Sequence, residues 1–153
     1  MNSSTDRIER KILLTAPVSR VWRALSNAEE FGDWFGVELK GKTFAPGHRV
    51  QGRVTYPGYE HIVLDIVIER MEPERLLSWR WHPYPADPSV DYSKEPTTLV
   101  VFTLEEVEDG TLLIVVESGF DNIPPSRRLE AFRMNSEGWD EQMKSIEKHV
   151  ATP

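Results

Sequence analysis

The 153-residue sequence predicts a single α+β domain in which an antiparallel sheet of six to seven strands packs against a long C-terminal helix. Three observations lead to this fold class. An alternating segment near the N-terminus is followed by two short helical patterns. The middle of the chain has an apolar period of two, broken by short turn signals. The last 30 residues return to a helical period of 3.6.

Residues 7–14 alternate between apolar and charged side chains, with Ile8, Ile12 and Leu14 on one parity, as expected for a half-buried strand. Pro17 suits the start of a helix, and Val18, Val21, Trp22 and Leu25 then give it one apolar face. Ser26-Asn27 can end this helix and cap a second short helix that carries Phe31, Trp34 and Phe35.

Turn signals such as Pro57-Gly58 and Asp109-Gly110 divide residues 37–119 into about six strands, near 37–40, 48–55, 61–71, 76–82, 97–106 and 111–118. Short turns between successive strands predict an antiparallel meander. Residues 83–96 form the exception, a loop with four prolines whose length makes it a candidate functional loop.

The C-terminal segment predicts a helix of about 25 residues, roughly 37 Å long, which should cross the sheet obliquely because it is longer than any strand. Its apolar series is Leu129, Phe132, Ser136, Trp139, Met143, Ile146 and Val150. Gly138 lies inside this helix, where glycine costs about 0.8–1 kcal/mol relative to alanine. Either a close approach by the sheet or a ligand, or a local kink, would explain it.

The stretch GVELKGKT, residues 36–43, fits the letters of a phosphate-binding loop. Such a loop needs a buried strand before it and a helix after it, so that backbone N–H groups meet the phosphates. Here a helical segment precedes the motif, and Pro46, which lacks an N–H, follows it. We therefore expect no nucleotide site.

The totals exclude several classes of protein. A net charge of −7 with no extended basic cluster argues against nucleic acid as a partner. The chain has no cysteine, no apolar signal core and no apolar run near the length that spans a bilayer. We expect a cytoplasmic protein that does not insert into a membrane.

No metal, cofactor or catalytic group is indicated by a motif. The four histidines, at 48, 61, 82 and 149, lack ligand spacing, and no nucleophile elbow occurs. General acid or base chemistry by His61 or Glu117 stays open, because pairs formed by folding are invisible in one sequence. The interpretation as an enzyme is the less favoured one.

Four stretches together resemble the activator of heat-shock-protein ATPase homologue (AHSA-like) family of the START-like, or SRPBCC, superfamily. They are APVSRVWRALSNAEEFGDWF (16–35), ERMEPERLLSWRW (69–81), TTLVVFTLEEVEDGTLLIVVESGF (97–120) and EGWDEQMKSI (137–146). The resemblance implies one helix-grip (Bet v 1-like) domain over 1–153, with its core at about 7–150. In this fold a curved sheet wraps the C-terminal helix and leaves an apolar cavity. It further implies hydrophobic ligands, and for the eukaryotic namesake a chaperone partner and a stress response.

Trp79 and Trp81 share a parity and can form an aromatic wall with Phe102 and the helix residues. The candidate cavity residues are Trp34, Arg53, His61, Trp79, Trp81, Phe102, Glu117, Phe132, Trp139 and Met143. The alternatives are an ordinary packed core for the aromatic residues and solvated sheet positions for the polar ones. His61 and Asp65 share a parity, so that the carboxylate could orient the imidazole, whereas Arg80 and His82 are expected on the outer face.

Three functions remain in view: a domain that binds a small hydrophobic molecule, an interaction module that contacts a chaperone or another protein, and a cyclase or hydrolase using the same cavity. The first is favoured. The interaction module would use the loop at 83–96, with Tyr84 and Tyr92. The ligand's identity and the oligomeric state are not encoded in any motif.

Overall fold

The computed structural model describes residues 6–87 and 89–151. In chain order the elements are β1 (Arg7–Leu14), α1 (Val18–Ser26), α2 (Ala28–Phe35), β2 (Arg49–Arg53), β3 (Val63–Glu72), β4 (Leu76–Trp81), the short 3₁₀ helix η1 (Tyr92–Lys94), β5 (Thr98–Val107), β6 (Gly110–Ser118), the 3₁₀ helix η2 (Phe120–Asn122) and α3 (Pro125–Val150).

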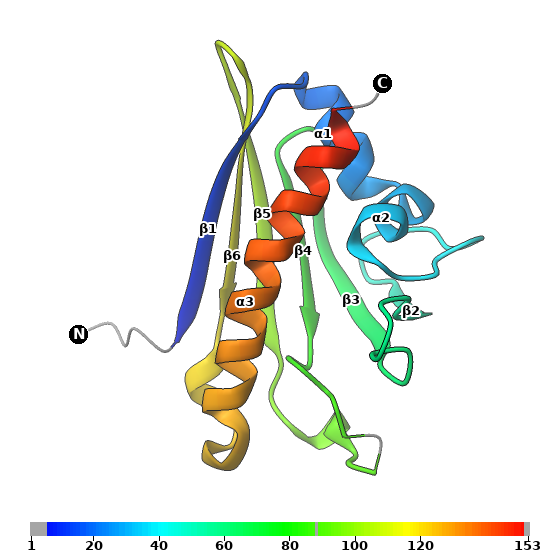
Figure 1. Ribbon diagram of the computed structural model, residues 1–153, viewed down its shortest axis with the longest axis vertical. Helices are drawn as coiled ribbons and strands as arrows, with labels where there is room; N and C mark the ends of the chain where they lie inside the picture. The colour runs from blue at the N-terminus through cyan, green and yellow to red at the C-terminus, as the bar shows by residue number, and fades with distance from the viewer. Residues whose placement is uncertain (1–5, 88, 152–153) are drawn as a thin grey trace.

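The six strands form one antiparallel sheet in the order β1-β6-β5-β4-β3-β2, so that β2 to β6 make a meander and β1 returns to pair with β6 (Figure 1). The strand predicted near 37–40 is reduced to a single bridge between Val37 and Val54. Val37 and Leu39 are buried, but the chain turns at Gly41, with φ near 77°, before a longer strand can form.

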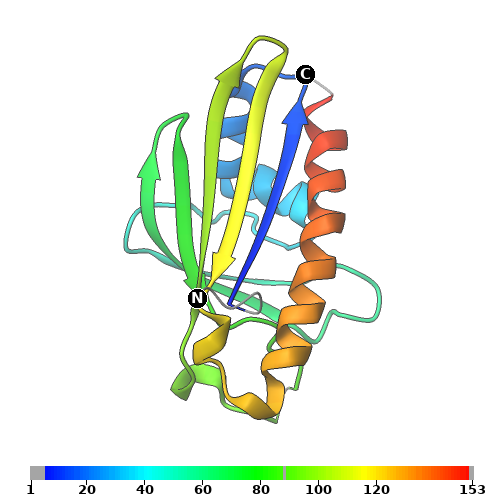
Figure 2. The same ribbon diagram turned by 90° about the vertical axis from the view of Figure 1, so that its left-hand side faces the viewer.

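α3 runs obliquely over one face of the curved sheet and lies beside β1 in the side view (Figures 1 and 2). Its inward residues include Trp139, Ile146 and Val150, all buried. The predicted helix-grip arrangement is confirmed. Leu129, expected on the apolar face, is instead 73% exposed, because the first turns of α3 extend beyond the end of the sheet (Figure 2).

The two short helices cover the other end of the same face. The Asn27 side chain accepts a hydrogen bond from the Glu30 backbone N–H at 3.0 Å, which confirms the predicted cap of α2. Gly36, with φ near 89°, ends α2. GVELKGKT therefore begins at a helix terminus and, among the described residues, leads into a turn and β2 instead of a helix.

Gly138 lies in an unbroken stretch of α3 and is exposed. A Cβ built on it would have no atom within 4 Å among the described residues. Neither a close approach nor a break in the helix accounts for this glycine, and nothing in the structure explains it.

Across residues 6–87 and 89–151, no helix combines the length and the apolar character needed to cross a membrane.

Candidate functional site

A fully buried carboxyl group lies between the sheet and α3. Glu117 is 0% exposed on the inward parity of β6, where the preceding inward residues Leu113 and Val115 are apolar. Two strands, β4 and β5, and the helix supply its hydrogen-bond donors. The register places Val100 opposite Glu117 and Thr98 opposite Trp81, which brings the three strands together at this point.

Four side chains donate hydrogen bonds to this carboxyl. Trp81 Nε1 and Thr98 Oγ1 each lie 2.6 Å from Oε2, and Trp139 Nε1 lies 2.8 Å from Oε1. Asn135 Nδ2 lies 3.0 and 3.1 Å from the two oxygens. Asn135 and Trp139 are four residues apart on α3 and therefore share one face of the helix.

Burial raises the pKa of Glu117 above its ordinary value, because a charge loses its hydration in the interior. The hydrogen bonds from Thr98, Trp81, Trp139 and Asn135 act in the opposite direction and offset part of this rise in pKa. The four donors carry no charge, so the carboxyl is satisfied by hydrogen bonds without an ion pair.

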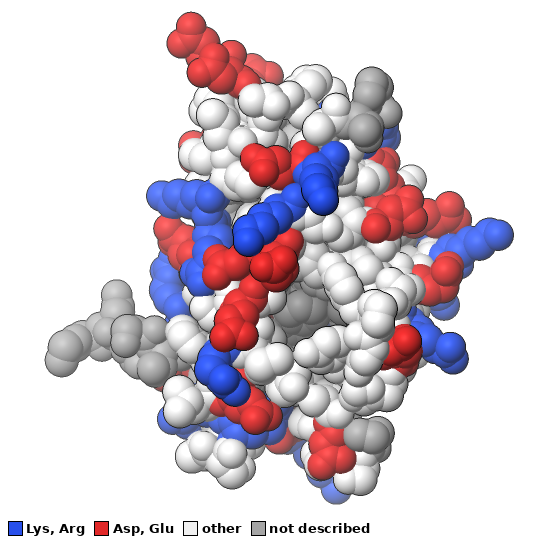
Figure 3. Space-filling view, viewed as in Figure 1, with Lys and Arg blue, Asp and Glu red and all other residues white. Residues whose placement is uncertain are grey.

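A pocket of about 980 Å³ opens beside this cluster. β3 and β4 remain paired only as far as Val67 and Arg80, and beyond this point they diverge (Figure 1). The lining therefore combines residues from both faces of the sheet: Phe35, Arg49, Gln51, Val54, His61, Ile62, Val63, Leu64, Asp65, Val67, Arg80, Trp81, His82, Tyr84, Pro85, Asp87, Val90, Asp91, Tyr92, Ser93, Thr97 and Asn135. Figure 3 shows this side of the molecule hollowed next to the charged surface of α3.

The long loop between β4 and β5 forms one wall of the pocket, and Arg127 of α3 holds it in place. The guanidinium donates to Glu95 at 2.7 Å and to the carbonyl oxygens of Pro83 and Tyr84 at 2.9 and 3.2 Å. It also lies 4.7 Å from the centre of the Tyr92 ring, within range of a cation–π contact. One side chain thus ties both ends of the loop to the helix.

Trp81 and Asn135 belong to both features. Each lines the pocket, and each donates a hydrogen bond to Glu117. The carboxyl itself is inaccessible and does not line the pocket. The pocket is therefore separated from the buried carboxyl by one layer of side chains.

The aromatic wall predicted from the sequence forms a packed cluster. Trp79 and Phe102 are 0% exposed with ring centres 5.2 Å apart, and Phe102 and Trp139 lie 5.7 Å apart. Trp34 is also in this core, where its indole donates to the Ala24 carbonyl at 2.8 Å. Among these predicted residues, Trp81 is the one that also lines the pocket.

The remaining predicted residues are dispersed. His61 lines the pocket, Arg53 is exposed on β2, and Phe132 packs against Phe120 with ring centres 5.2 Å apart. Met143 is buried and faces β1.

The predicted orientation of His61 by Asp65 is not observed. The Asp65 carboxylate instead accepts from Arg49 at 2.6 and 2.9 Å and from Gln51 at 3.3 Å. The Arg49 guanidinium holds the pKa of Asp65 below its ordinary value. Arg80 pairs with Glu69 at 3.1 Å, as its outward parity suggested. His82 is half-buried, lies against the pocket and contacts the Glu95 carbonyl oxygen.

Sequence reasoning missed Thr98, Asn135 and Arg127. For Asn135 a signal existed, because it lies four residues before Trp139 and three after Phe132 on the inward side of the helix. The partners of Arg127 lie 32 to 44 residues away along the chain, so no local pattern points to them.

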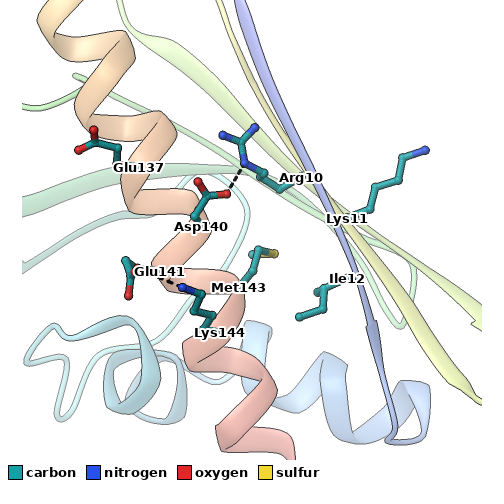
Figure 4. Close-up of a pocket in the computed structure, with 8 residues that line it drawn as sticks. All are labelled: Arg10, Lys11, Ile12, Glu137, Asp140, Glu141, Met143 and Lys144. Atoms are coloured by element: carbon teal, nitrogen blue, oxygen red, sulfur yellow. Dashed lines mark hydrogen bonds and ion pairs between the residues drawn. The ribbon is translucent and has the colours of Figure 1, made fainter.

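A second, shallower groove of about 610 Å³ lies between β1 and α3. Figure 4 shows Arg10 directed to Asp140, at 2.6 Å, and Met143 beside Ile12. The Glu141–Lys144 ion pair at its rim is exposed. Its lining consists mainly of charged side chains that are already paired. No group of three or more potential metal ligands occurs among residues 6–87 and 89–151.

Similar structures share this architecture. A protein from Mesorhizobium loti is 25% identical, with a TM-score of 0.71, and the alignment covers 95% of this chain and 96% of the other. A Nitrosomonas europaea protein is 22% identical, with a TM-score of 0.72 over 98% and 97% of the two chains. A protein of the dynemicin biosynthetic locus has a TM-score of 0.72 at 23% identity, and this chain spans 48% of its length.

Comparison with curated proteins gives no match. The model of one protein family, described as Activator of Hsp90 ATPase homolog 1-like protein, matches residues 15–151. This match covers most of the domain, and the structural neighbours have the same fold. The chain therefore belongs to the Activator of Hsp90 ATPase homolog 1-like family.

Proposed function

We propose that this protein binds a small, largely apolar molecule in a pocket between β3, β4, α3 and the loop that joins β4 to β5. Residues 83–97 of this connection are called the 83–97 loop below. The observation that carries the proposal is the pocket itself, of about 980 Å³, with aromatic and aliphatic side chains next to a few polar groups. Its volume is at the upper end of the range of small-molecule sites. Family membership supports ligand binding or regulation as the general role.

The proposed binding position is one end of the interface between helix and sheet. The middle of that interface is filled by rings such as Trp79, Phe102 and Trp139, with centres 5 to 6 Å apart. Trp81 lies at the boundary between the packed core and the pocket, where the strands diverge. Its ring centre is 5.4 Å from that of Trp79, and the side chain also lines the pocket. A flat apolar ligand would continue this aromatic stack.

We propose binding without catalysis. A general acid or base must come within hydrogen-bond reach of the substrate. Glu117 is 0% exposed, and Asp65 is engaged by Arg49 and Gln51. The Asp65 carboxylate is therefore not available to orient His61, whose charged neighbour is Glu60, the preceding residue in the chain. These placements favour a binding protein over an enzyme.

A titration with flat apolar probes such as naphthalene, followed by the tryptophan indole resonances in NMR spectra, tests this proposal. We expect the Trp81 resonance to shift. Val54→Lys, which places an ammonium group in the pocket lining at a position partly buried against the core, should weaken binding about tenfold or more. Val18→Lys is the matched control, because Val18 is also partly buried against the core but lies outside the pocket.

Two results would refute the proposal: no saturable shift with any probe, or an equal loss of affinity in both lysine variants. Native mass spectrometry of the purified protein gives an independent readout, namely the mass of any molecule that co-purifies.

A chaperone partner is the second candidate function, because the family description refers to activation of the Hsp90 ATPase. The 83–97 loop is the surface that we propose for it, since Val90 is 43% exposed there. The test is the ATPase rate of a purified Hsp90 with wild-type protein and with residues 85–95 replaced by a Gly-Ser linker. An unchanged rate with wild-type protein would exclude this function.

A further inference from the structure

Asn135 places one amide group between the buried carboxyl and the pocket. Its Nδ2 contacts both oxygens of Glu117, at 3.0 and 3.1 Å. The nitrogen and oxygen of a carboxamide are bonded to the same planar carbon and point in different directions, so Oδ1 faces elsewhere when Nδ2 contacts both oxygens of Glu117. Asn135 lines the pocket, and no hydrogen bond reaches Oδ1 among the described residues.

The other partners of Glu117 fix which atom of the amide faces the carboxyl. The indole N–H groups of Trp81 and Trp139 can only donate, so the carboxyl accepts from both. An ionised carboxyl must also accept from Asn135. A protonated carboxyl can place its proton on Oε2 and donate it to the Thr98 hydroxyl at 2.6 Å, because that hydroxyl can also accept. With the proton in that position, Asn135 donates to Glu117 in both forms.

The charged side chains of the sheet that line the pocket are already engaged in ion pairs. Arg49 and Gln51 bind Asp65, and Arg80 binds Glu69. These residues lie on the outward parity of β2, β3 and β4, whereas Asn135 lies on α3, on the inner side of the sheet. Next to the apolar Phe35, Leu64 and Trp81, Oδ1 of Asn135 is therefore an acceptor without a partner.

We infer that the pocket selects apolar molecules that carry a hydrogen-bond donor, such as a hydroxyl group, and that Asn135 Oδ1 accepts this bond. The inference rests on the proposed ligand-binding function and adds its chemical selectivity. A molecule that offers only an ether or ketone oxygen would bury Oδ1 unpaired, and discrimination of this kind is strong where a site is built for one hydrogen bond. Asn135 is then a specificity-determining residue, positioned by Glu117.

The experiment compares 2-naphthol with 2-methoxynaphthalene, which share a ring system but differ in the donor. Calorimetry with the wild-type chain should give about tenfold tighter binding of 2-naphthol. Asn135→Leu should abolish the preference, because the variant has no Oδ1 to accept from 2-naphthol and none for 2-methoxynaphthalene to bury unpaired. Ser136→Ala should keep the preference, because Ser136 accepts from Arg10 and does not line the pocket.

The wild-type comparison requires no variant to fold. Equal affinities for the two probes would overturn the inference while leaving the proposed function intact, and so would tighter binding of 2-methoxynaphthalene, which would mean that the amide presents its NH₂ to the pocket. If neither these probes nor naphthalene binds, the proposed function fails and the selectivity falls with it.

Discussion

Two buried tryptophans provide a direct test of the hydrogen-bond network around Glu117. Trp139, 2% exposed, donates its indole N–H to Glu117 at 2.8 Å. Trp79, 0% exposed, has no hydrogen-bond partner for its indole nitrogen among the described residues. Both belong to one aromatic cluster, since each packs against Phe102. Trp139→Phe and Trp79→Phe therefore remove the same atoms from similar surroundings, but only the first removes a hydrogen bond.

The expected difference follows from this comparison. The loss of packing is similar in the two variants and cancels. At a pH at which Glu117 is ionised, a hydrogen bond to its carboxylate contributes about 1.5–3 kcal/mol. Trp139→Phe should therefore lower the free energy of unfolding by about 1.5–3 kcal/mol more than Trp79→Phe does. For a chain of this length that corresponds to roughly 3–12 °C in melting temperature.

Urea denaturation, followed by circular dichroism, measures both free energies of unfolding. A second readout is the pKa of Glu117 from carboxyl carbon NMR shifts. The Trp139 hydrogen bond lowers this pKa, so its removal should raise the pKa further, whereas Trp79→Phe should leave it unchanged. Equal stabilities of the two variants, or a less stable Trp79→Phe, would refute the assignment of Glu117 as the centre of the network.

Three further predictions concern other parts of the chain. Burial raises the folded-state pKa of Glu117 above 4.5, so its contribution to stability is complete below the unfolded pKa and is lost as pH rises through the folded pKa. Urea titrations should show wild type losing stability relative to Glu117→Gln from pH 4.5 upward, and the opposite slope would contradict this. Gly138→Ala should raise the free energy of unfolding by about 0.8–1 kcal/mol, and any decrease would indicate a hidden constraint. Arg127→Gln should speed amide hydrogen exchange in residues 83–97 about 30-fold, for a loss of about 2 kcal/mol. Arg75→Gln, at an exposed arginine between β3 and β4, is the control and should not speed it. Equal exchange in both variants would show that Arg127 does not hold the loop.

The sequence predicted the fold well where the structure of a helix or strand depends only on residues close together in the chain. The alternation in residues 7–14 and the cap at Asn27 depend on local chemistry, and both appear in the structure. The apolar periodicity predicted burial or strand pairing incorrectly where a helix or strand has no neighbouring element to pack against. Leu129 has the correct helical spacing but lies on turns beyond the end of the sheet, and Val37 forms one bridge instead of a strand.

The position of the pocket could not be predicted from the sequence, because the pocket forms where the backbone pairing between β3 and β4 ends. β3 continues to pair with β2 at Val63, while its pairing with β4 ends at Val67 and Arg80. No residue type marks this divergence. The same reasoning explains why the aromatic side chains were predicted as one wall. A shared parity shows that Trp79 and Trp81 face the same way but not that, of the two, only Trp81 lines the pocket.

The composition of the buried cluster connects the core with the pocket. A buried ionisable group is weak evidence for stability, because apolar side chains of similar volume often serve a core equally well. Glu117 has neutral donors and a pKa raised by burial, so its position is not explained by stability alone. It does fix the direction of two side chains that line the pocket, the Trp81 indole and the Asn135 amide. Replacing Glu117 with an apolar residue would remove the acceptor that orients both groups, which makes the carboxyl a positioning group for the pocket as well as a member of the core.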